Sequence, residues 1–377
     1  VHFLGLLSDG GVHSHTSHLR GLIDATQEYG LQKVFVHAFT DGRDVDPKSG
    51  KHYVQDLQDY IANTSVKVAS VIGRYYAMDR DRRWERVKLA YDLLVNGIGT
   101  HSTNAVATIE ESYEVNVTDE FIHPTAIIDA SAVIAADAKI GPYCIIGPNV
   151  TIGAGTQLHS HVVVGGYTRI GEHNEIFQFA SVGEVCQDLK YAGEETWLEI
   201  GDDNKIREHC SLHRGTVQDP GITKIGSHNL LMVNTHIAHD CVVGDHNIFA
   251  NNVGVAGHVH VGDYVIVGGN SGIHQFCKID SYSMIGGASL IVKDVPAYVM
   301  VSGNPAHAFA MNVEGMRRKG WSKNVIQGLR TAFKLIYKEG LTTEQALERI
   351  RAEILPEVAE AQLLIDSLEQ SERGIVR

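Results

Sequence analysis

The sequence predicts a multi-domain chain: an N-terminal α/β fragment with a parallel sheet, a parallel β-helix of hexapeptide repeats, and an α-helical C-terminal domain. Three observations support this division. Short apolar runs alternate with amphipathic stretches up to residue 121, an aliphatic residue then recurs every six positions, and helical periodicity follows from about residue 312. We therefore place the domains at residues 1–121, 122–311 and 312–377.

The N-terminal third alternates strand-like and helix-like segments, an order that favours a small parallel sheet. Each apolar run is followed by an amphipathic stretch. The expected strands are Val1–Leu7, Val34–Phe39 and Val66–Ile72, and the expected helices are residues 16–29, 50–62 and 83–96.

A six-residue repeat dominates the middle of the chain. Stepping by six from Ile128 to Val182, every position carries a branched aliphatic residue. The step resumes at 200–212 and, after a shift, runs from Ile225 to Ile291 with a single Phe. One inward aliphatic per repeat indicates a short strand plus a turn, so three repeats form an 18-residue triangular coil. Positions 18 apart should then stack at the inter-strand spacing of about 4.8 Å.

Two segments, residues 184–199 and 213–224, break this period and should loop out of the prism. Loops held on a rigid scaffold are where binding residues concentrate. Beyond the repeats, Ser322–Lys338 and Thr342–Ile354 have helical periodicity. Thr342 and Gln345 have the spacing of a capping box at a helix start.

Composition and charge exclude several classes of protein. The chain has 377 residues, 44% of them apolar, which argues against disorder. With 32 basic and 45 acidic side chains its formal charge is −13, unfavourable for a general nucleic-acid or membrane-surface binder. No run of about 18 apolar residues predicts a membrane helix, and we expect no signal peptide. Five scattered cysteines without a CxxC pair favour a reduced, cytoplasmic protein.

The 18-residue period brings scattered histidines to one edge of the expected prism. Ile237, Val255 and Ile273 are 18 residues apart and should occupy one wall in successive coils. If the second loop adds seven residues, Leu212 falls in the same column. The histidines beside these four aliphatics are His213, His236, His239, His258 and His274. Because imidazole transfers protons readily near neutral pH, this column is a candidate active site.

Two chemistries fit such a column. Neutral imidazoles bind zinc, and a free imidazole can act as general base toward a hydroxyl. The inward-facing Ile237 separates His236 from His239, so these two are poor candidates for ligands of one ion, and we predict no metal site. Asp240 follows His239 and could orient it, although adjacent residues of a strand point to opposite faces.

Residues 122–377 closely resemble the acyl-carrier-protein-dependent UDP-N-acetylglucosamine O-acyltransferases that catalyse the first step of lipid A synthesis. Hexapeptide repeats alone are shared by many transferases, but the ordered set of motifs is specific. These motifs are IHPTA at 122–126, GEVCQDLKY at 183–191, HRGTV at 213–217, HIAHD at 236–240, AGHV at 256–259, HQF at 274–276 and NVEG at 312–315.

The resemblance implies a left-handed parallel β-helix assembled as a homotrimer. It implies transfer of an (R)-3-hydroxyacyl group from acyl carrier protein to the 3-hydroxyl of UDP-N-acetylglucosamine. No cofactor is implied beyond the phosphopantetheine that carries the acyl group. The basic residues Arg317, Arg318 and Lys319 would form a local patch for the acidic carrier protein.

The resemblance also implies roles for individual residues. His239 matches the general base, Asp240 its neighbour, and the backbone N–H of Gly257 the donor to the oxyanion. Gly287 matches the position that limits acyl-chain length. The positions that match substrate contacts are Gln187, Asp188, Lys190, His213, His236, His258, His274, Gln275, Asn312, Glu314 and Arg318.

The N-terminal third resembles the substrate-binding domain of cofactor-independent phosphoglycerate mutases. The motifs are SDGGVHSH at 8–15, DGRD at 41–44, GRYYAMDR at 73–80 and TDEF at 118–121. By this resemblance the phosphoglycerate contacts would be His13, Arg43, Asp44, Arg74 and Arg80. The phosphatase-like domain, with its nucleophilic serine and metal ligands, is missing, so we expect no mutase activity. We also expect residues 97–121 to be poorly packed, because in the mutase they lead into that missing domain.

The chain thus looks like a chimera of unrelated modules, an engineered fusion or a mis-joined reading frame. Two further hypotheses stay open at this point. One is a zinc hydratase resembling γ-class carbonic anhydrase, with His236, His258 and His274 as inter-subunit ligands. The other is a non-catalytic scaffold in which the prism trimerises a phosphoglycerate-binding domain.

Overall fold

The computed structural model describes residues 1–96, 99–127, 131–141 and 144–377. Ile128, where the hexad series is expected to begin, lies outside the described residues. The chain forms two compact units, which are described separately. The first comprises Val1–Ala132 and Ile140–Pro148, and the second comprises Val133–Lys139 and Asn149–Arg377.

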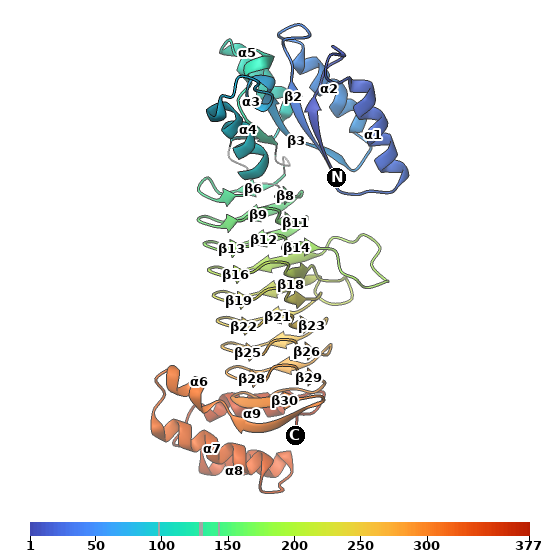
Figure 1. Ribbon diagram of the computed structural model, residues 1–377. Helices are drawn as coiled ribbons and strands as arrows, with labels where there is room; N and C mark the ends of the chain where they lie inside the picture. The colour runs from blue at the N-terminus through green and yellow to red at the C-terminus, as the bar shows by residue number, and fades with distance from the viewer. Residues whose placement is uncertain (97–98, 128–130, 142–143) are drawn as a thin grey trace. The chain divides into compact units, whose positions relative to one another are not determined.

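The first unit contains a five-stranded sheet in the order β1-β2-β3-β5-β4 (Figure 1). Its strands are β1 (His2–Leu6), β2 (Val34–Thr40), β3 (Val66–Gly73), β4 (Thr100–Ser102) and β5 (Thr125–Ile127). The three expected strands are confirmed and pair in parallel. However, β5 pairs antiparallel with β3, so the sheet is mixed rather than wholly parallel.

Helices cover both faces of this sheet. They are α1 (Thr16–Glu28), α2 (Gly50–Ile61), α3 (Arg74–Ala77), α4 (Trp84–Asn96), α5 (Ala105–Glu114) and the short 3₁₀ turn η1 (Asp119–Phe121). Successive strand residues point to opposite faces. Val71 therefore packs in the core under α1, α2 and α5, and Ile72 in the core under α3 and α4.

The expectation of poor packing over residues 97–121 is wrong for the described part of that segment. Ile109 of α5 is fully buried in the main core of the unit. Asn104 caps α5, its Oδ1 accepting from the N–H groups of Val106 and Ala107 at 2.9 and 3.2 Å. Asp119 is also buried and accepts from the N–H of Gly50 at 2.7 Å. The segment packs because its apolar residues cover the sheet of its own unit.

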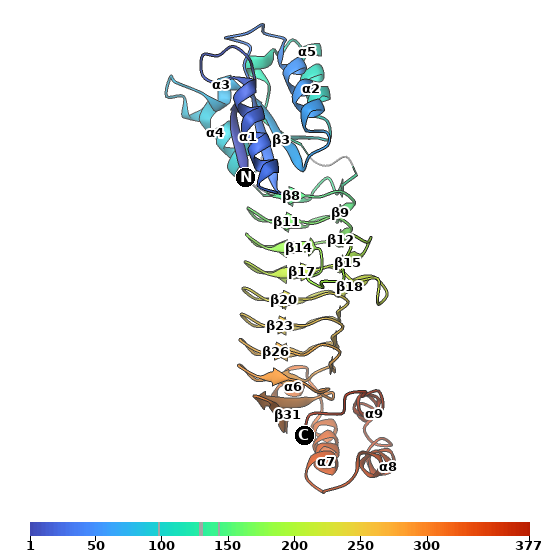
Figure 2. The same cartoon turned by 90° about the vertical axis from the view of Figure 1, so that its right-hand side faces the viewer.

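Short parallel strands build the second unit, a three-walled β-helix (Figures 1 and 2). From β9 on, the walls are β9-β12-β15-β18-β21-β24-β27, β10-β13-β16-β19-β22-β25-β28-β30-β31 and β11-β14-β17-β20-β23-β26-β29. Up to the second loop the strands of the repeat region are β6 (Val133–Ile134), β7 (Lys139–Ile140), β8 (Ile145–Ile146), β9 (Val150–Ile152), β10 (Gln157–Leu158), β11 (Val163–Val164), β12 (Thr168–Ile170), β13 (Glu175–Ile176), β14 (Ser181–Glu184), β15 (Trp197–Ile200), β16 (Lys205–Ile206) and β17 (Ser211–His213). After that loop they are β18 (Ile222–Ile225), β19 (Leu230–Leu231), β20 (His236–Ile237), β21 (Val242–Val243), β22 (Ile248–Phe249), β23 (Gly254–Val255), β24 (His260–Val261), β25 (Ile266–Val267), β26 (Gly272–Ile273), β27 (Lys278–Ile279), β28 (Met284–Ile285) and β29 (Leu290–Ile291).

The predicted 18-residue register is confirmed. Ile225 pairs with Val243, and Val243 with Val261. Leu212 pairs with Ile237, so the second loop does add seven residues. Every hexad aliphatic from position 152 to position 291 is at most 4% exposed, because the strands turn these side chains into a continuous apolar column.

Both predicted loops leave the prism, but they are shorter than expected (Figure 1). They span residues 185–196 and 214–221, since strands β15 and β18 begin earlier than the hexad rule suggests. Leu198 and Thr223, each two residues before a hexad aliphatic, also point inward and are fully buried.

The prism interior contains a column of buried asparagines. The Asn204 side chain donates to Asn174 Oδ1 at 3.0 Å, and its own Oδ1 accepts from the N–H of Asn229 at 2.9 Å. Asn229 Oδ1 accepts in turn from the N–H of Asn247 at 2.8 Å. Each amide therefore satisfies backbone groups of the next coil that the turns leave unpaired.

A hairpin of β30 (Val299–Gly303) and β31 (Ala306–Met311) closes the prism. The helices that follow are α6 (Val313–Arg318), α7 (Lys323–Tyr337), α8 (Thr343–Glu353) and α9 (Ala361–Glu369). The capping box of Thr342 and Gln345 is confirmed. Cys186, Cys210, Cys241 and Cys277 form no disulfide, and within the described ranges no helix is long and apolar enough to cross a membrane.

Candidate active site

The structure brings four of the five candidate histidines into contact as two pairs. The rings of His213 and His236 meet edge-to-face at 4.8 Å, and those of His239 and His258 at 5.0 Å. His274 is exposed, with its Nδ1 3.1 Å from the carbonyl oxygen of Gln275. Among the described residues it makes no ring contact with another histidine.

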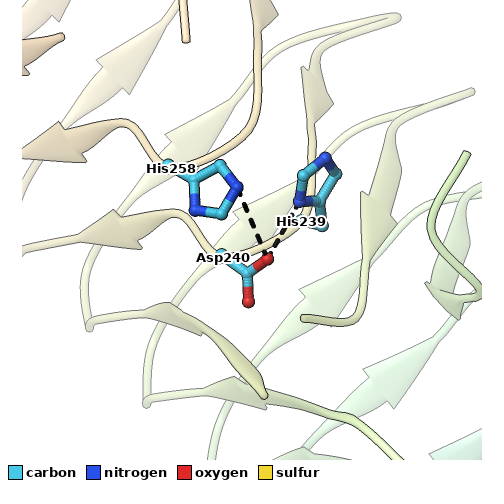
Figure 3. Close-up of side chains that lie close together, drawn as sticks. All are labelled: His239, Asp240 and His258. Carbon is cyan, nitrogen blue, oxygen red and sulfur yellow. Dashed lines mark hydrogen bonds and ion pairs between the residues drawn. The ribbon is translucent and has the colours of Figure 1, made fainter. Parts of the chain in front are cut away.

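His239 and Asp240 form a direct pair, with the Nδ1 of His239 2.9 Å from Asp240 Oδ2 (Figure 3). Adjacent residues of a strand could not meet in this way. Both residues lie in the turn after β20, and Asp240 has the left-handed φ of +57°. This conformation suits Asp better than most residues. Because an ionised carboxylate only accepts, the Nδ1 of His239 carries the proton and its Nε2 is the free base.

Threonines on neighbouring coils hold the carboxylate of Asp240. Its two oxygens accept from the backbone N–H and the hydroxyl of Thr216, at 2.8 and 2.6 Å. The backbone N–H of Asp240 donates to the hydroxyl of Thr223 at 2.8 Å. The Asp240 side chain is only 1% exposed, so these bonds fix its position relative to His239.

Three contacts orient the ring of His258. Its Nδ1 is 2.7 Å from Oδ2 of Asp219, a residue of loop 214–221. Its face stacks on Phe276, 18 residues further along, at 4.4 Å and 8° between planes. Its Nε2 then points toward Asp240 Oδ2 at 4.0 Å (Figure 3).

Gly257 lies directly against the base. A β-carbon at this position would be 2.5 Å from Cε1 and 2.7 Å from Nε2 of His239. Only glycine leaves the free nitrogen of His239 accessible here. Among the hydrogen bonds of the described residues none uses the Gly257 N–H, which leaves this donor beside the base.

Burial keeps the neighbouring histidines neutral. Desolvation, with a smaller contribution from His236, lowers the pKa of His213 to about 4. Desolvation also lowers the pKa of His236, although its Nδ1 lies 2.7 Å from the hydroxyl of Ser211. Both rings are therefore uncharged near neutral pH and can serve as hydrogen-bonding groups.

The predicted substrate-contacting residues lie on three elements. Gln187, Asp188 and Lys190 belong to loop 185–196, and Gln187 and Lys190 are exposed. Asp188 Oδ1 accepts from the N–H of Lys190 at 3.0 Å, which folds the tip of this loop. Gln275 is exposed in the turn after β26, next to Phe276.

The C-terminal candidates Asn312, Glu314 and Arg318 already make hydrogen bonds or ion pairs within the chain. The Asn312 side chain is the N-cap of α6, accepting from Gly315 N–H at 3.0 Å, and it donates to the carbonyl of Tyr282 at 2.9 Å. Glu314 pairs with Arg318 at 3.3 Å, so it partly neutralises the basic patch. At Gly287 a β-carbon would meet only ordinary contacts at 3.4 Å or more.

Sequence reasoning missed two residues that shape the site. Thr216 holds Asp240, and Asp219 holds His258. The signals for them were the break in the hexad period, which marks their loop as a place for binding residues, and, for Thr216, its position in the HRGTV motif at 213–217. Their partners depend on how that loop folds back, which the repeat does not specify.

In the first unit, two of the expected phosphoglycerate contacts, Arg43 and Arg74, have carboxylate partners. Arg74 is buried, and its Nη1 contacts Asp41 Oδ1 at 2.5 Å and Asp44 Oδ2 at 2.7 Å. Arg43 pairs with Glu120. His13 and Arg80 are exposed. The guanidinium groups of Arg43 and Arg74 are therefore already paired with carboxylates, and the predicted phosphate contacts stay predictions.

Comparison with known proteins identifies the second unit. An acyl-[acyl-carrier-protein]–UDP-N-acetylglucosamine O-acyltransferase of Psychrobacter sp. (strain PRwf-1) is 67% identical over 256 residues, which are 68% of this chain and 99% of that protein. The chain belongs to this O-acyltransferase family. The crystal structure of LpxA from Acinetobacter baumannii is 85% identical, with a TM-score of 0.66 over 67% of this chain and 97% of that one. The Moraxella catarrhalis enzyme is 64% identical with the same TM-score and coverage.

Family models agree with this assignment to the O-acyltransferases. The model described as Udp N-acetylglucosamine O-acyltransferase, Domain 2, matches residues 294–376. The bacterial transferase hexapeptide model matches residues 222–257.

The first unit is similar to a different family. The model of the BPG-independent PGAM N-terminus matches residues 1–140. The 2,3-bisphosphoglycerate-independent phosphoglycerate mutase of Flavobacterium johnsoniae is 76% identical over 132 residues, which are 35% of this chain but only 26% of that mutase. The predicted fusion of two unrelated modules is therefore confirmed.

Proposed function

We propose that the chain is an acyltransferase that moves an (R)-3-hydroxyacyl group from acyl carrier protein to the 3-hydroxyl of UDP-N-acetylglucosamine, the first step of lipid A synthesis. The observation that carries this proposal is the partly buried His239–Asp240 pair next to Gly257. The high identity to enzymes of this name supports it.

In the proposed reaction the Nε2 of His239 takes the proton of the sugar hydroxyl as its oxygen attacks the thioester carbonyl. Asp240 holds the ring in the tautomer with Nε2 free and stabilises the imidazolium that forms. The N–H of Gly257 donates to the oxyanion of the tetrahedral intermediate. The C–S bond then breaks, and His239 returns its proton to the departing phosphopantetheine thiolate.

Substrate binding is assigned to the surrounding polar side chains. Lys190 and the neutral His213 and His236 offer hydrogen-bonding groups for the nucleotide sugar. Arg317 and Arg318, both exposed, offer positive charge to the carrier protein. We propose a homotrimer, as the family resemblance implies, with no nucleic-acid partner, no insertion into the membrane and no cofactor of its own.

The test is an assay of acyl transfer with UDP-N-acetylglucosamine and hydroxyacyl carrier proteins of several chain lengths. His239→Ala should lower kcat by more than about 100-fold, since general-base catalysis contributes about 10²–10⁴-fold. His246→Ala is the matched control, because His246 is an exposed turn residue stacked on His228 and Tyr264 outside this site. Full transfer activity in His239→Ala would show that the base is wrongly assigned.

The two alternative functions are less well supported. Within one chain, the described residues that group closely enough to hold a metal ion are His239, Asp240 and His258, whereas the hydratase hypothesis places its ligands His236, His258 and His274 between subunits. A purely structural prism would not need the buried pair at His239. The high sequence identity to O-acyltransferases supports neither the hydratase nor the non-catalytic scaffold.

For the first unit we propose no mutase activity, because the chain corresponds to only a quarter of the mutase. Residual affinity for 3-phosphoglycerate can be measured by titration calorimetry. Arg43→Ala is the variant of choice, since Arg43 is on the surface whereas Arg74 is buried. Equal binding heat in the parent and in Arg43→Ala would remove Arg43 from the contact list.

A further inference from the structure

We propose that His239, Asp240 and His258 form an inhibitory site for a divalent transition metal such as Zn²⁺. The ion would take the place of the proton that now lies between His239 and Asp240. The site is inferred from its geometry alone, and only its inhibitory effect rests on the proposed function.

The three side chains offer a suitable set of ligand atoms. Within the described part of the chain they are the group whose ligand atoms all lie within 4.8 Å of one another. The separation is 2.9 Å between His239 Nδ1 and Asp240 Oδ2, and 4.0 Å between His258 Nε2 and Asp240 Oδ2. Bonds of about 2.0–2.1 Å to a tetrahedral ion place two ligand atoms about 3.3 Å apart. Small rotations of the two imidazoles would bring all three atoms to that spacing.

The ring of His258 presents a suitable ligand atom. Its Nδ1 is hydrogen-bonded to Asp219 Oδ2 at 2.7 Å, so in the neutral ring the proton lies on Nδ1 and the lone pair on Nε2. Nε2 faces Asp240 Oδ2 at 4.0 Å, so a cation between the two atoms could be bound by both. A carboxylate behind a histidine is also the usual outer partner of a metal-bound imidazole.

The Asp240 ligand is equally well prepared. Thr216 binds both of its oxygens, which fixes the carboxylate in place. The lone pair of Oδ2 that now accepts from His239 would bind the ion instead. Asp240 is therefore held in place before any ion arrives, and Phe276 stacked on His258 leaves that ring only a small rotation.

Metal binding would disable the base without changing the charge of His239. Coordination needs the lone pair of Nδ1, so the Nδ1 proton must leave, and the neutral ring then carries its proton on Nε2. Nε2 is the atom that accepts the substrate proton in the proposed reaction. A bound ion and an active base therefore exclude each other.

The binding test uses the full chain, zinc chloride in titration calorimetry, and Co²⁺ in visible absorption as a reporter of tetrahedral coordination. We expect one tight site per chain in the parent and a loss of more than tenfold in affinity in His258→Gln. His228→Gln is the matched control, because His228 also lies near a carboxylate, Asp203, at 3.7 Å but belongs to no group of three possible ligands among the described residues. The control should retain the tight site.

A second variant tests the outer partner without touching a ligand. Asp219→Ala should weaken zinc binding about 10- to 100-fold, as for other outer-shell carboxylates. No tight site in the parent, or equal affinity in the parent and His258→Gln, would overturn the site. Equal affinity in the parent and Asp219→Ala would overturn the role of Asp219.

Inhibition is measured separately, as acyl transfer against zinc concentration. We expect half-inhibition at the concentration that half-fills the calorimetric site, and recovery after addition of a chelator. Tight binding without inhibition would overturn the inhibitory role. A zinc-free chain without transferase activity would instead count against the proposed function and leave the binding result intact.

Discussion

The Cα of Gly257 lies against the imidazole of His239, so closely that a β-carbon would be 2.7 Å from Nε2. The two residues come from successive coils, and the glycine keeps the catalytic nitrogen open. The same glycine offers its backbone N–H beside the base. The turn that contains Gly257 therefore does two things: it leaves room for the base, and it offers the proposed donor to the oxyanion.

Gly257→Ala should lower kcat by more than about 100-fold, because its methyl group displaces the base and the oxyanion donor together. The β-carbon would contact the end of the His239 side chain rather than backbone. We therefore expect the melting temperature to change little. Transfer kinetics and thermal unfolding measured on the same samples separate the two effects. Wild-type kcat in Gly257→Ala would contradict the assigned geometry.

Asp240→Asn should lower kcat about 10²- to 10⁴-fold with a small change in KM, because the imidazolium loses its negative partner. Thr216→Val should give a smaller decrease, since it removes only the hydroxyl bond to Asp240 and leaves the backbone bond. Steady-state kinetics of both variants check the order. A Thr216→Val rate below that of Asp240→Asn would show that Thr216 acts through another contact.

Buried His213 should make stability depend on pH. Its folded pKa of about 4 lies below the unfolded value of about 6.5, so the unfolded chain takes up the proton first as the pH falls. The neutral ring therefore makes its full contribution to the free energy of unfolding above about pH 6.5. This contribution is lost as the pH falls from about 6.5 to 4. The difference between the folded and unfolded pKa corresponds to a loss of about 3 kcal/mol in the free energy of unfolding once His213 is fully protonated.

Urea unfolding of the parent and of His213→Gln over this pH range tests that prediction. The free energy of unfolding should fall more steeply with decreasing pH in the parent than in the variant. Other titrating groups are common to both proteins and cancel in the comparison. Parallel pH profiles would mean that His213 is protonated equally in both states.

The asparagine column should be important for stability rather than for catalysis. Asn204→Ala removes the acceptor of the buried Asn229 N–H and the donor to the carbonyl of Gly226. Each unsatisfied buried group costs about 1–3 kcal/mol, so for these two groups we expect a loss of about 2–6 kcal/mol in the free energy of unfolding. Asn251→Ala, at an exposed turn of the same prism, is the control and should change it by less than about 0.5 kcal/mol. Equal stabilities of the two variants would show that the column is dispensable.

The sequence by itself determined the architecture of the prism. The hexad aliphatics predicted the 18-residue register. With seven extra residues assigned to the second loop, this register also predicted the pairing of Leu212 with Ile237, which the structure confirms. A repeat can be read in this way because each coil contacts only its neighbours, so local periodicity translates directly into tertiary register. The same register correctly placed His239 near His258.

Only the tertiary structure decided which groups complete the site. The left-handed turn at Asp240 brings its carboxylate to the neighbouring His239, against the rule for adjacent strand residues. Asp219 reaches His258 across 39 positions from a loop that obeys no period. In the first unit, Arg74 is occupied by Asp41 and Asp44 rather than open to a ligand. Such contacts depend on the conformation of turns and on how loops fold back, and the repeat pattern specifies neither. The register of the coils is specified, because only one register buries the whole column of aliphatic side chains.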